Sequence, residues 1–158
     1  MLFRITGLSP CPFRHLFGQS DVKLSALGVE RHVADASPGY PDRIELRDAQ
    51  PGESVLLLNY LHQPARTAYR SSHAIYVLEG ARKRYDRIDD IPEALCSRLI
   101  SLRGFSGAGQ MQEADIGPGD SLEPLIDRMF ANPTVSYIHA HYAKPGCFAA
   151  RIDRVVSA

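Results

Sequence analysis

The chain has 158 residues with 18 basic and 18 acidic side chains, which gives a formal net charge of zero at neutral pH. This length is typical of a single domain, and an apolar fraction of 44% is typical of a soluble globular protein. Charge is spread evenly along the chain, which excludes the basic face of a dedicated nucleic-acid binder. The longest aliphatic run, Val55–Leu58, is too short to span a membrane. We therefore expect one domain over residues 1–158 with no nucleic-acid or membrane partner.

The cysteines and the first residues indicate where the protein works. Cys11, Cys96 and Cys147 are an odd number of widely spaced cysteines, which is typical of free thiols in a reducing compartment. The apolar run on either side of Arg4 is too short for a secretory signal. We expect a cytoplasmic protein.

Segments rich in β-branched or aromatic residues and bounded by turn residues predict the strands. In chain order they lie at residues 2–5, in two pieces within 29–46, and at 54–61, 73–78, 99–105, 110–116, 135–142 and 148–155. The charged run 82–90 alternates basic and acidic side chains, which predicts a solvated loop between the fourth and fifth of these regions.

Three segments predict helices, each with a polar candidate for the N-cap. Their signals are Ser20 with a stop at Gly28, Asp90 with Pro92 in the first turn, and Asp120 or Ser121 with a stop at Asn132-Pro133. The third is the clearest, because apolar residues recur with helical spacing from Leu122 to Phe130. Strands outnumber helices and the late strands form hairpins, so we predict an α+β fold with a largely antiparallel sheet and two or three helices.

Three segments carry a resemblance to a known family: FRITGL at the start, LLLNYLHQPARTAYRSSHAIYV in the middle and YIHAHYAKPGCFAARIDR near the end. Together they resemble the bacterial domain-of-unknown-function 1203 family. The resemblance implies a small single-domain bacterial protein. It implies no reaction and no catalytic residues, so the chemistry rests on the residues themselves.

Two segments of the chain contain no acidic residue: 54–78 and 134–152. They hold four of the six histidines and four basic side chains, namely His62, His73, His139 and His141 with Arg66, Arg70, Lys144 and Arg151. If the two segments meet in space, they form a locally positive surface that favours a phosphate or carboxylate. The alternative is that buried strands are poor in acids for structural reasons alone.

His139-Ala140-His141 is the sharpest local pattern. In a strand these two imidazoles share one face and can converge on one metal ion. A third ligand would have to come from His62, His73 or Cys147, and no acidic residue lies nearby to complete the set. The sequence therefore predicts no metal and no cofactor, and leaves a metal-free polar site and structural histidines as the alternatives.

The face that His139 and His141 share depends on the hairpin turn that follows. An even loop places Phe148 and Ala150 on their face, whereas an odd loop places Cys147 and Arg151 there. Gly146 at the tip predicts a turn that needs positive φ. The sequence does not decide between the two registers, nor between an inert and a reactive Cys147.

Two hypotheses for function follow. In the first, the chain is an enzyme or binding protein for a small anionic molecule, held by Arg70, His73, Lys144 and Arg151, with His62, His139 and His141 as the candidates for proton transfer. In the second, the histidines are structural and the function is a surface for a protein partner. The sequence favours the first hypothesis, because histidines and basic side chains concentrate where acids are missing.

Overall fold

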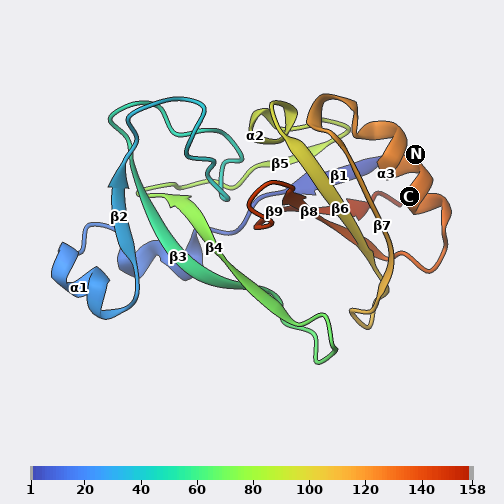
Figure 1. Cartoon of the computed structure of the whole chain (residues 1–158), viewed down its shortest axis with the longest axis horizontal. Helices are drawn as coiled ribbons and strands as arrows, with labels where there is room; N and C mark the ends of the chain where they lie inside the picture. Colours follow the sequence, from blue (N-terminus) through green and yellow to red (C-terminus); the bar gives the residue numbers. More distant parts are fainter. Residues whose placement is uncertain (1, 157–158) are drawn as a thin grey trace.

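The computed structural model describes residues 2–156, and its strands divide into two antiparallel sheets. Figure 1 shows them side by side, the smaller sheet on the left and the larger on the right. The six-stranded sheet has the order β5-β1-β9-β8-β6-β7 and the three-stranded sheet the order β2-β3-β4. The strands are β1 Phe3–Thr6, β2 Glu30–Val33, β3 Ser54–Gln63, β4 Ser71–Leu78, β5 Asp86–Ile88, β6 Leu99–Phe105, β7 Met111–Pro118, β8 Tyr137–Tyr142 and β9 Phe148–Arg154.

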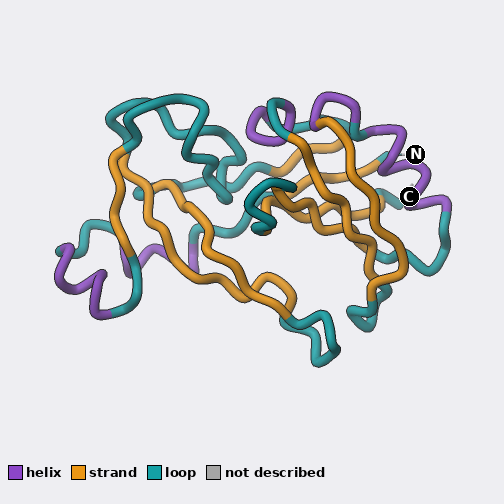
Figure 2. The backbone as a smooth tube through the Cα atoms, in the orientation of Figure 1, coloured by secondary structure: helices purple, strands orange, loops and turns teal. Residues whose placement is uncertain are grey.

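The helices are short and lie at the outer sides of the two sheets (Figure 2). They are α1 Asp21–Ala26, α2 Glu93–Cys96 and α3 Glu123–Ala131, with 3-10 turns η1 Cys11–Leu16 and η2 Gly119–Ser121. The predicted α+β class with a largely antiparallel arrangement is confirmed, although the strands form two sheets.

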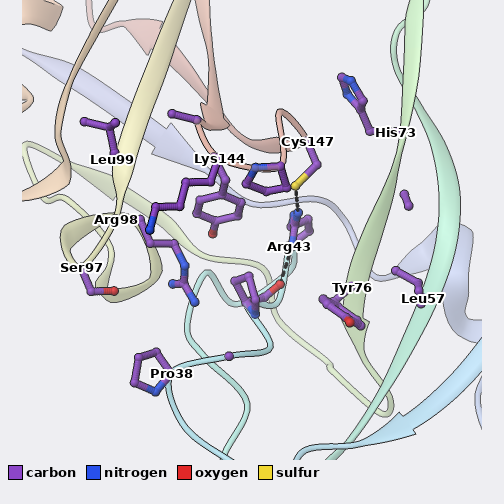
Figure 3. A pocket seen from close by; sticks show the side chains of 16 residues that line it. Pro38, Arg43, Leu57, His73, Tyr76, Ser97, Arg98, Leu99, Lys144 and Cys147 are labelled. Carbon is purple, nitrogen blue, oxygen red and sulfur yellow. Dashed lines mark hydrogen bonds between the residues drawn. The ribbon is translucent and has the colours of Figure 1, made fainter.

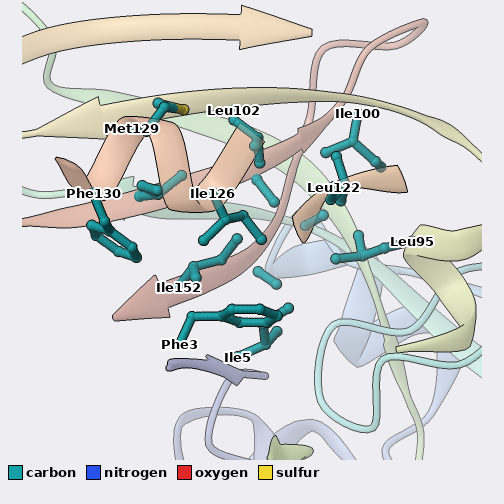
Figure 4. Close-up of a cluster of buried hydrophobic side chains, with 14 of the residues drawn as sticks. Phe3, Ile5, Leu95, Ile100, Leu102, Leu122, Ile126, Met129, Phe130 and Ile152 are labelled. Carbon is teal, nitrogen blue, oxygen red and sulfur yellow. The ribbon is translucent and has the colours of Figure 1, made fainter. Parts of the chain in front are cut away.

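Each sheet has its own hydrophobic core. Helix α3 covers the six-stranded sheet, and its buried Ile126, Met129 and Phe130 pack on strand residues such as Ile100 and Ile152 (Figure 4). The three-stranded sheet buries Leu56 and Ile75 against Leu24 of α1 and Phe13 of η1. Each core therefore stabilises one sheet, and the contact between the sheets has to come from other groups.

Several local predictions hold. The Ser20 hydroxyl accepts a hydrogen bond from the Lys23 amide and caps α1, and Gly28 has a φ of 72° after the helix ends. The hairpins β6–β7 and β8–β9 form where they were expected. The 3-10 turn η1 was not predicted, although it buries Phe13 and Leu16.

The predicted caps of the second and third helices are wrong. Helix α2 starts after Pro92, so Asp90 lies too far upstream to cap it. Before α3, residues 119–121 are wound into η2, and the Ser121 hydroxyl donates to the Asp120 carboxylate at 3.0 Å. These two side chains thus satisfy each other, and α3 has no side-chain cap.

Two other segments differ from the prediction. Only one of the two strands expected within 29–46 forms, and residues 34–53 run as an irregular connection above the gap between the sheets (Figure 2). There the Asp42 carboxylate accepts hydrogen bonds from the Leu78 and Glu45 amides and replaces strand pairing. Within the charged run, residues 86–88 form the edge strand β5, because Arg4 of β1 pairs with Asp86 through two bonds of 2.6 Å.

Ile126→Ala should lower the free energy of unfolding by about 2–5 kcal/mol, because it removes three carbons from a fully buried position between α3 and the sheet. Urea unfolding measures this. Val22→Ala on the exposed face of α1, where the side chain is 83% exposed, is the control and should change stability by less than about 0.5 kcal/mol. Similar losses in both variants would contradict this description of the core.

Candidate functional site

Four histidines from the two sheets meet in the space between the sheets. His62 ends β3 and His73 lies on β4, whereas His139 and His141 lie on β8. The rings of His62 and His73 are stacked with centroids 4.7 Å apart, and the His62 ring lies 5.1 Å from that of His141. We call these four residues the histidine cluster. The two acid-free segments of the sequence therefore do meet in space.

A β-bulge in the β8–β9 hairpin decides which residues face the cluster. His139 lies opposite Arg151, but the register shifts between Ala140 and His141, so that His141 lies opposite Phe148. The hairpin thus combines one partner from each of the two registers that the sequence allowed. The Phe148 ring stacks on that of His62 with centroids 5.2 Å apart. Gly146 in the turn has a φ of 80°, as its position predicted.

Three members of the cluster are almost fully buried, and this sets their charge. His62, His139 and His141 are 7%, 4% and 1% exposed. Burial lowers the pKa of His62 to about 4 and the pKa values of His139 and His141 to about 3, with further lowering by neighbouring histidines and by Arg103. Burial also lowers the pKa of His73. The cluster is therefore neutral at physiological pH.

The ring nitrogens of the cluster are only partly satisfied. His141 Nδ1 lies 3.0 Å from the Gly146 carbonyl oxygen, and His62 Nε2 lies 3.3 Å from the Ser71 hydroxyl. The Nδ1 atoms of His62, His73 and His139 are buried without any hydrogen-bond partner. Buried polar atoms without a partner are rare. The cluster therefore has an unused capacity to bind a ligand.

One ring nitrogen from each of His62, His139 and His141 lies within 4.8 Å of the other two. Three neutral imidazoles at such separations can hold a metal ion. In the described part of the chain, no other group of histidine, cysteine or acidic side chains comes together in this way.

A cavity of about 610 Å³ lies next to the cluster (Figure 3). His73 and Tyr76 of β4 line one side, and the turn residues Lys144 and Cys147 line the other. Residues 97–99 and the irregular segment around Arg43 complete the lining. This size falls within the range of small-molecule sites in proteins.

Arg43 supplies a buried positive charge to this cavity. Its side chain is 1% exposed, and its guanidinium donates to the carbonyls of Phe148 at 2.7 Å and Pro41 at 2.6 Å. The remaining Nη2 lies 3.0 Å from the Cys147 sulfur, drawn as a dashed line in Figure 3. Among the described residues, Arg43 has no carboxylate partner, and its charge therefore remains uncompensated.

Two other basic side chains, Arg98 and Lys144, line the cavity. Two bonds of 2.6 and 2.9 Å to Asp48 neutralise the charge of Arg98. Lys144 is exposed at the turn. The described lining residues include no aspartate or glutamate, so the cavity favours an anion.

Tyr142 adds a buried hydroxyl that has no use within the fold. Its side chain is 2% exposed, and its hydroxyl oxygen has no hydrogen-bond partner in the described structure. Burial raises the pKa of Tyr142 to about 12, which keeps the hydroxyl protonated. Tyr142 lines the cavity, and its buried hydroxyl is a donor that the described fold leaves without a partner.

All four histidines of the cluster and every residue that lines the cavity except Pro38 fall within one family match. The family described as "Protein of unknown function (DUF1203)" matches residues 39–154. The chain belongs to the DUF1203 family. The match includes all four histidines of the cluster, and it begins after the opening FRITGL segment. A search of curated proteins and a search of solved structures found no match to this DUF1203 chain.

The structure separates the basic residues that the sequence grouped together. His73 and Lys144 line the cavity, whereas Arg70 lies on the exposed β3–β4 loop and donates to the Pro64 carbonyl. Arg151 pairs with Asp153, and its guanidinium lies 4.1 Å from the centre of the Tyr137 ring. Arg151 borders a second hollow of about 530 Å³, which His62 and His139 also line.

Sequence reasoning missed Arg43, Arg98 and Tyr142. Arg43 and Arg98 lie outside the two acid-free segments, and each is close in sequence to acidic residues. No local pattern marks Arg43 as buried, because its position depends on contacts with Phe148 and Cys147 about a hundred residues away. Tyr142 directly follows the His-x-His motif and lies inside the predicted strand 135–142, but nothing in the sequence distinguishes its hydroxyl from those of the other tyrosines.

No helix in the described part of this DUF1203 chain is long and apolar enough to cross a membrane.

Tyr142→Phe should leave the free energy of unfolding unchanged or raise it by about 1 kcal/mol, because the lost hydroxyl is buried and without a partner. Tyr137→Phe is the matched control. The Tyr137 hydroxyl accepts a hydrogen bond of 2.9 Å from Gln63, so this variant should lose about 1 kcal/mol. Urea unfolding of both variants measures the difference, and a larger loss in Tyr142→Phe would show that its hydroxyl has a structural partner.

Proposed function

We propose that the protein binds a small molecule carrying a phosphate or carboxylate group in the cavity beside the histidine cluster, as an enzyme or as a binding protein. The observation that carries this proposal is the Arg43 guanidinium, which reaches the cavity lining without a carboxylate partner among the described residues. A cavity with uncompensated positive charge and no acidic lining selects anions.

Arg43 suits the role of anion receptor because its charge is already fixed in place. A guanidinium has five N–H donors and binds a carboxylate or phosphate through two parallel hydrogen bonds. In Arg43, two carbonyls hold the group in position, and its Nη2 faces only the weak acceptor Cys147 Sγ. An anionic oxygen beside Nη2 would compensate a charge that is expensive to bury unpaired.

Other lining residues complement the rest of such a ligand. Lys144 adds a second charge at the turn, and the Tyr142 hydroxyl adds a neutral donor. Apolar side chains, including Leu57, Tyr76 and Leu99, cover the remaining walls and suit the uncharged part of a ligand. Burial lowers the pKa of His139 and His141 to about 3, so these rings are weak bases whose nitrogens suit hydrogen bonding to such a ligand better than proton transfer.

We also propose that the protein acts in a bacterial cytoplasm, without a nucleic-acid or membrane partner. All three cysteines are free thiols, which fits a reducing compartment. The formal net charge of zero leaves no general attraction to nucleic acid or to anionic lipid.

A thermal-shift panel of inorganic phosphate, sugar phosphates, nucleotides and small dicarboxylates tests the proposal. A ligand at 100 times its dissociation constant adds about 2.7 kcal/mol to stability, which should raise the melting temperature by roughly 5–10 °C. Calorimetry should then show that Lys144→Ala weakens binding of the best ligand by about 10- to 100-fold, because it removes one charge-assisted contact.

Two further variants make that result specific. Lys83→Ala removes an exposed lysine outside the cavity lining and should leave the affinity unchanged. Tyr142→Phe should keep the protein folded and weaken binding by about 10-fold. A panel without any stabilising anion, or a ligand insensitive to both Lys144→Ala and Tyr142→Phe, would contradict the proposal.

A further inference from the structure

We propose that His62, His139 and His141 bind one divalent transition-metal ion, with zinc as the ion that the donor set suits best. This inference goes beyond the proposed anion binding and does not depend on it, because three histidine side chains can hold a metal ion whether or not an anion occupies the cavity. The rings come from two different sheets, so the site exists only in the folded chain.

The distances carry the first step of the argument. One nitrogen from each ring lies within 4.8 Å of the other two. With zinc–nitrogen bonds of about 2.0–2.1 Å, a tetrahedral centre separates its ligand nitrogens by ~3.3 Å. Each nitrogen therefore has to move inward by about 1 Å for the three to coordinate one ion.

The hydrogen bonds leave one suitable nitrogen free on each ring. His141 Nδ1 donates to the Gly146 carbonyl, which fixes the tautomer whose Nε2 carries a lone pair. A backbone carbonyl behind the ligand ring is the usual outer partner of a metal-bound histidine. The Ser71 hydroxyl lies beside His62 Nε2 and leaves His62 Nδ1 free, and His139 Nδ1 has no hydrogen-bond partner in the described structure.

The unpartnered nitrogens are an independent observation that points to a ligand. His62 and His139 are each more than nine-tenths buried, and their Nδ1 atoms make no hydrogen bond. An unsatisfied buried polar group costs about 1–3 kcal/mol. Coordination of a metal ion would use the nitrogen lone pairs that make no hydrogen bond within the fold.

The donor set selects the class of ion. Three imidazoles and no carboxylate suit zinc and its transition-metal neighbours, whereas calcium and magnesium require oxygen ligands. Three histidines with an open fourth position is also the arrangement of catalytic zinc sites. The Phe148 ring against His62 and the Phe105 ring against His139, both at about 5 Å, enclose the site in apolar surface.

The surroundings add a preference for the fourth ligand. Arg103 of β6 and Arg151 of β9 lie directly opposite His139 on the two neighbouring strands, so both place positive charge near the site. A divalent cation in the site would therefore draw an anionic fourth ligand, either hydroxide or an acidic group of a small molecule. His73 stacks on His62 and lines the cavity, so it lies between the three ligands and the cavity but outside the ligand set.

Metal binding by the protein without an affinity tag tests this inference. After treatment with EDTA and removal of the chelator, equilibrium dialysis against zinc should yield one ion per chain. Cobalt should give the intense visible spectrum of a four-coordinate centre. His139→Phe should weaken zinc binding by more than about 100-fold, since loss of even an outer partner costs up to that factor. His15→Gln, at an exposed histidine outside the cluster, should bind as the unmodified chain does.

Two more variants keep the inference open to contradiction. His141→Asn retains a donor for the Gly146 carbonyl but has no counterpart of the imidazole Nε2, so it should also lose zinc. Circular dichroism shows whether His139→Phe and His141→Asn are folded. His73→Gln should retain one ion per chain. The inference is overturned if the unmodified chain binds no stoichiometric zinc, if folded His139→Phe and His141→Asn retain it, or if zinc is lost in His73→Gln alone. Anion binding is not measured in any of these experiments, so their failure would leave the proposed function untouched.

Discussion

The buried guanidinium of Arg43 is the contact on which the arrangement of the site depends. Its side chain joins the irregular segment at Pro41 to the β8–β9 turn at Phe148 and Cys147, and its charge lies 4.8 Å from the centre of the Tyr142 ring. Its backbone amide donates to the Tyr76 carbonyl of β4, and its carbonyl accepts from the Leu8 amide. One residue thus ties the smaller sheet to the hairpin of the larger one, and it does so at the wall of the cavity.

The division of the core into two clusters explains why polar chemistry gathers between the sheets. Each sheet covers its apolar face with its own helices, so that the surfaces that meet are free to carry imidazoles, a guanidinium and aromatic rings. Neutral histidines suit such an interface because their rings stack as aromatic groups do and their nitrogens still offer polar contacts. The histidine cluster therefore belongs to neither sheet alone, and the distances between its rings depend on the relative position of the two sheets.

The sequence predicts the parts of this structure that local patterns control. Most of the strands, the α3 apolar stripe and the Ser20 cap follow from spacing and side-chain type, and the two acid-free segments, whose meeting the sequence left open, hold the four histidines that come together. What the sequence could not supply depends on contacts between distant segments. The bulge at Ala140 changes the register of the hairpin, so the number of loop residues does not predict which side chains share a face. Asp120 and Ser121 form a hydrogen bond with each other where a helix cap was expected. Arg43 has an ordinary local sequence, and its burial depends on contacts with the distant β8–β9 turn.

The stacked rings of His62 and His73 have one more consequence. His73 lines the cavity of about 610 Å³ and His62 lines the hollow of about 530 Å³, so the stacked pair joins the linings of the two. A substitution at either histidine would therefore remove the stacking partner of a ring that lines the other hollow.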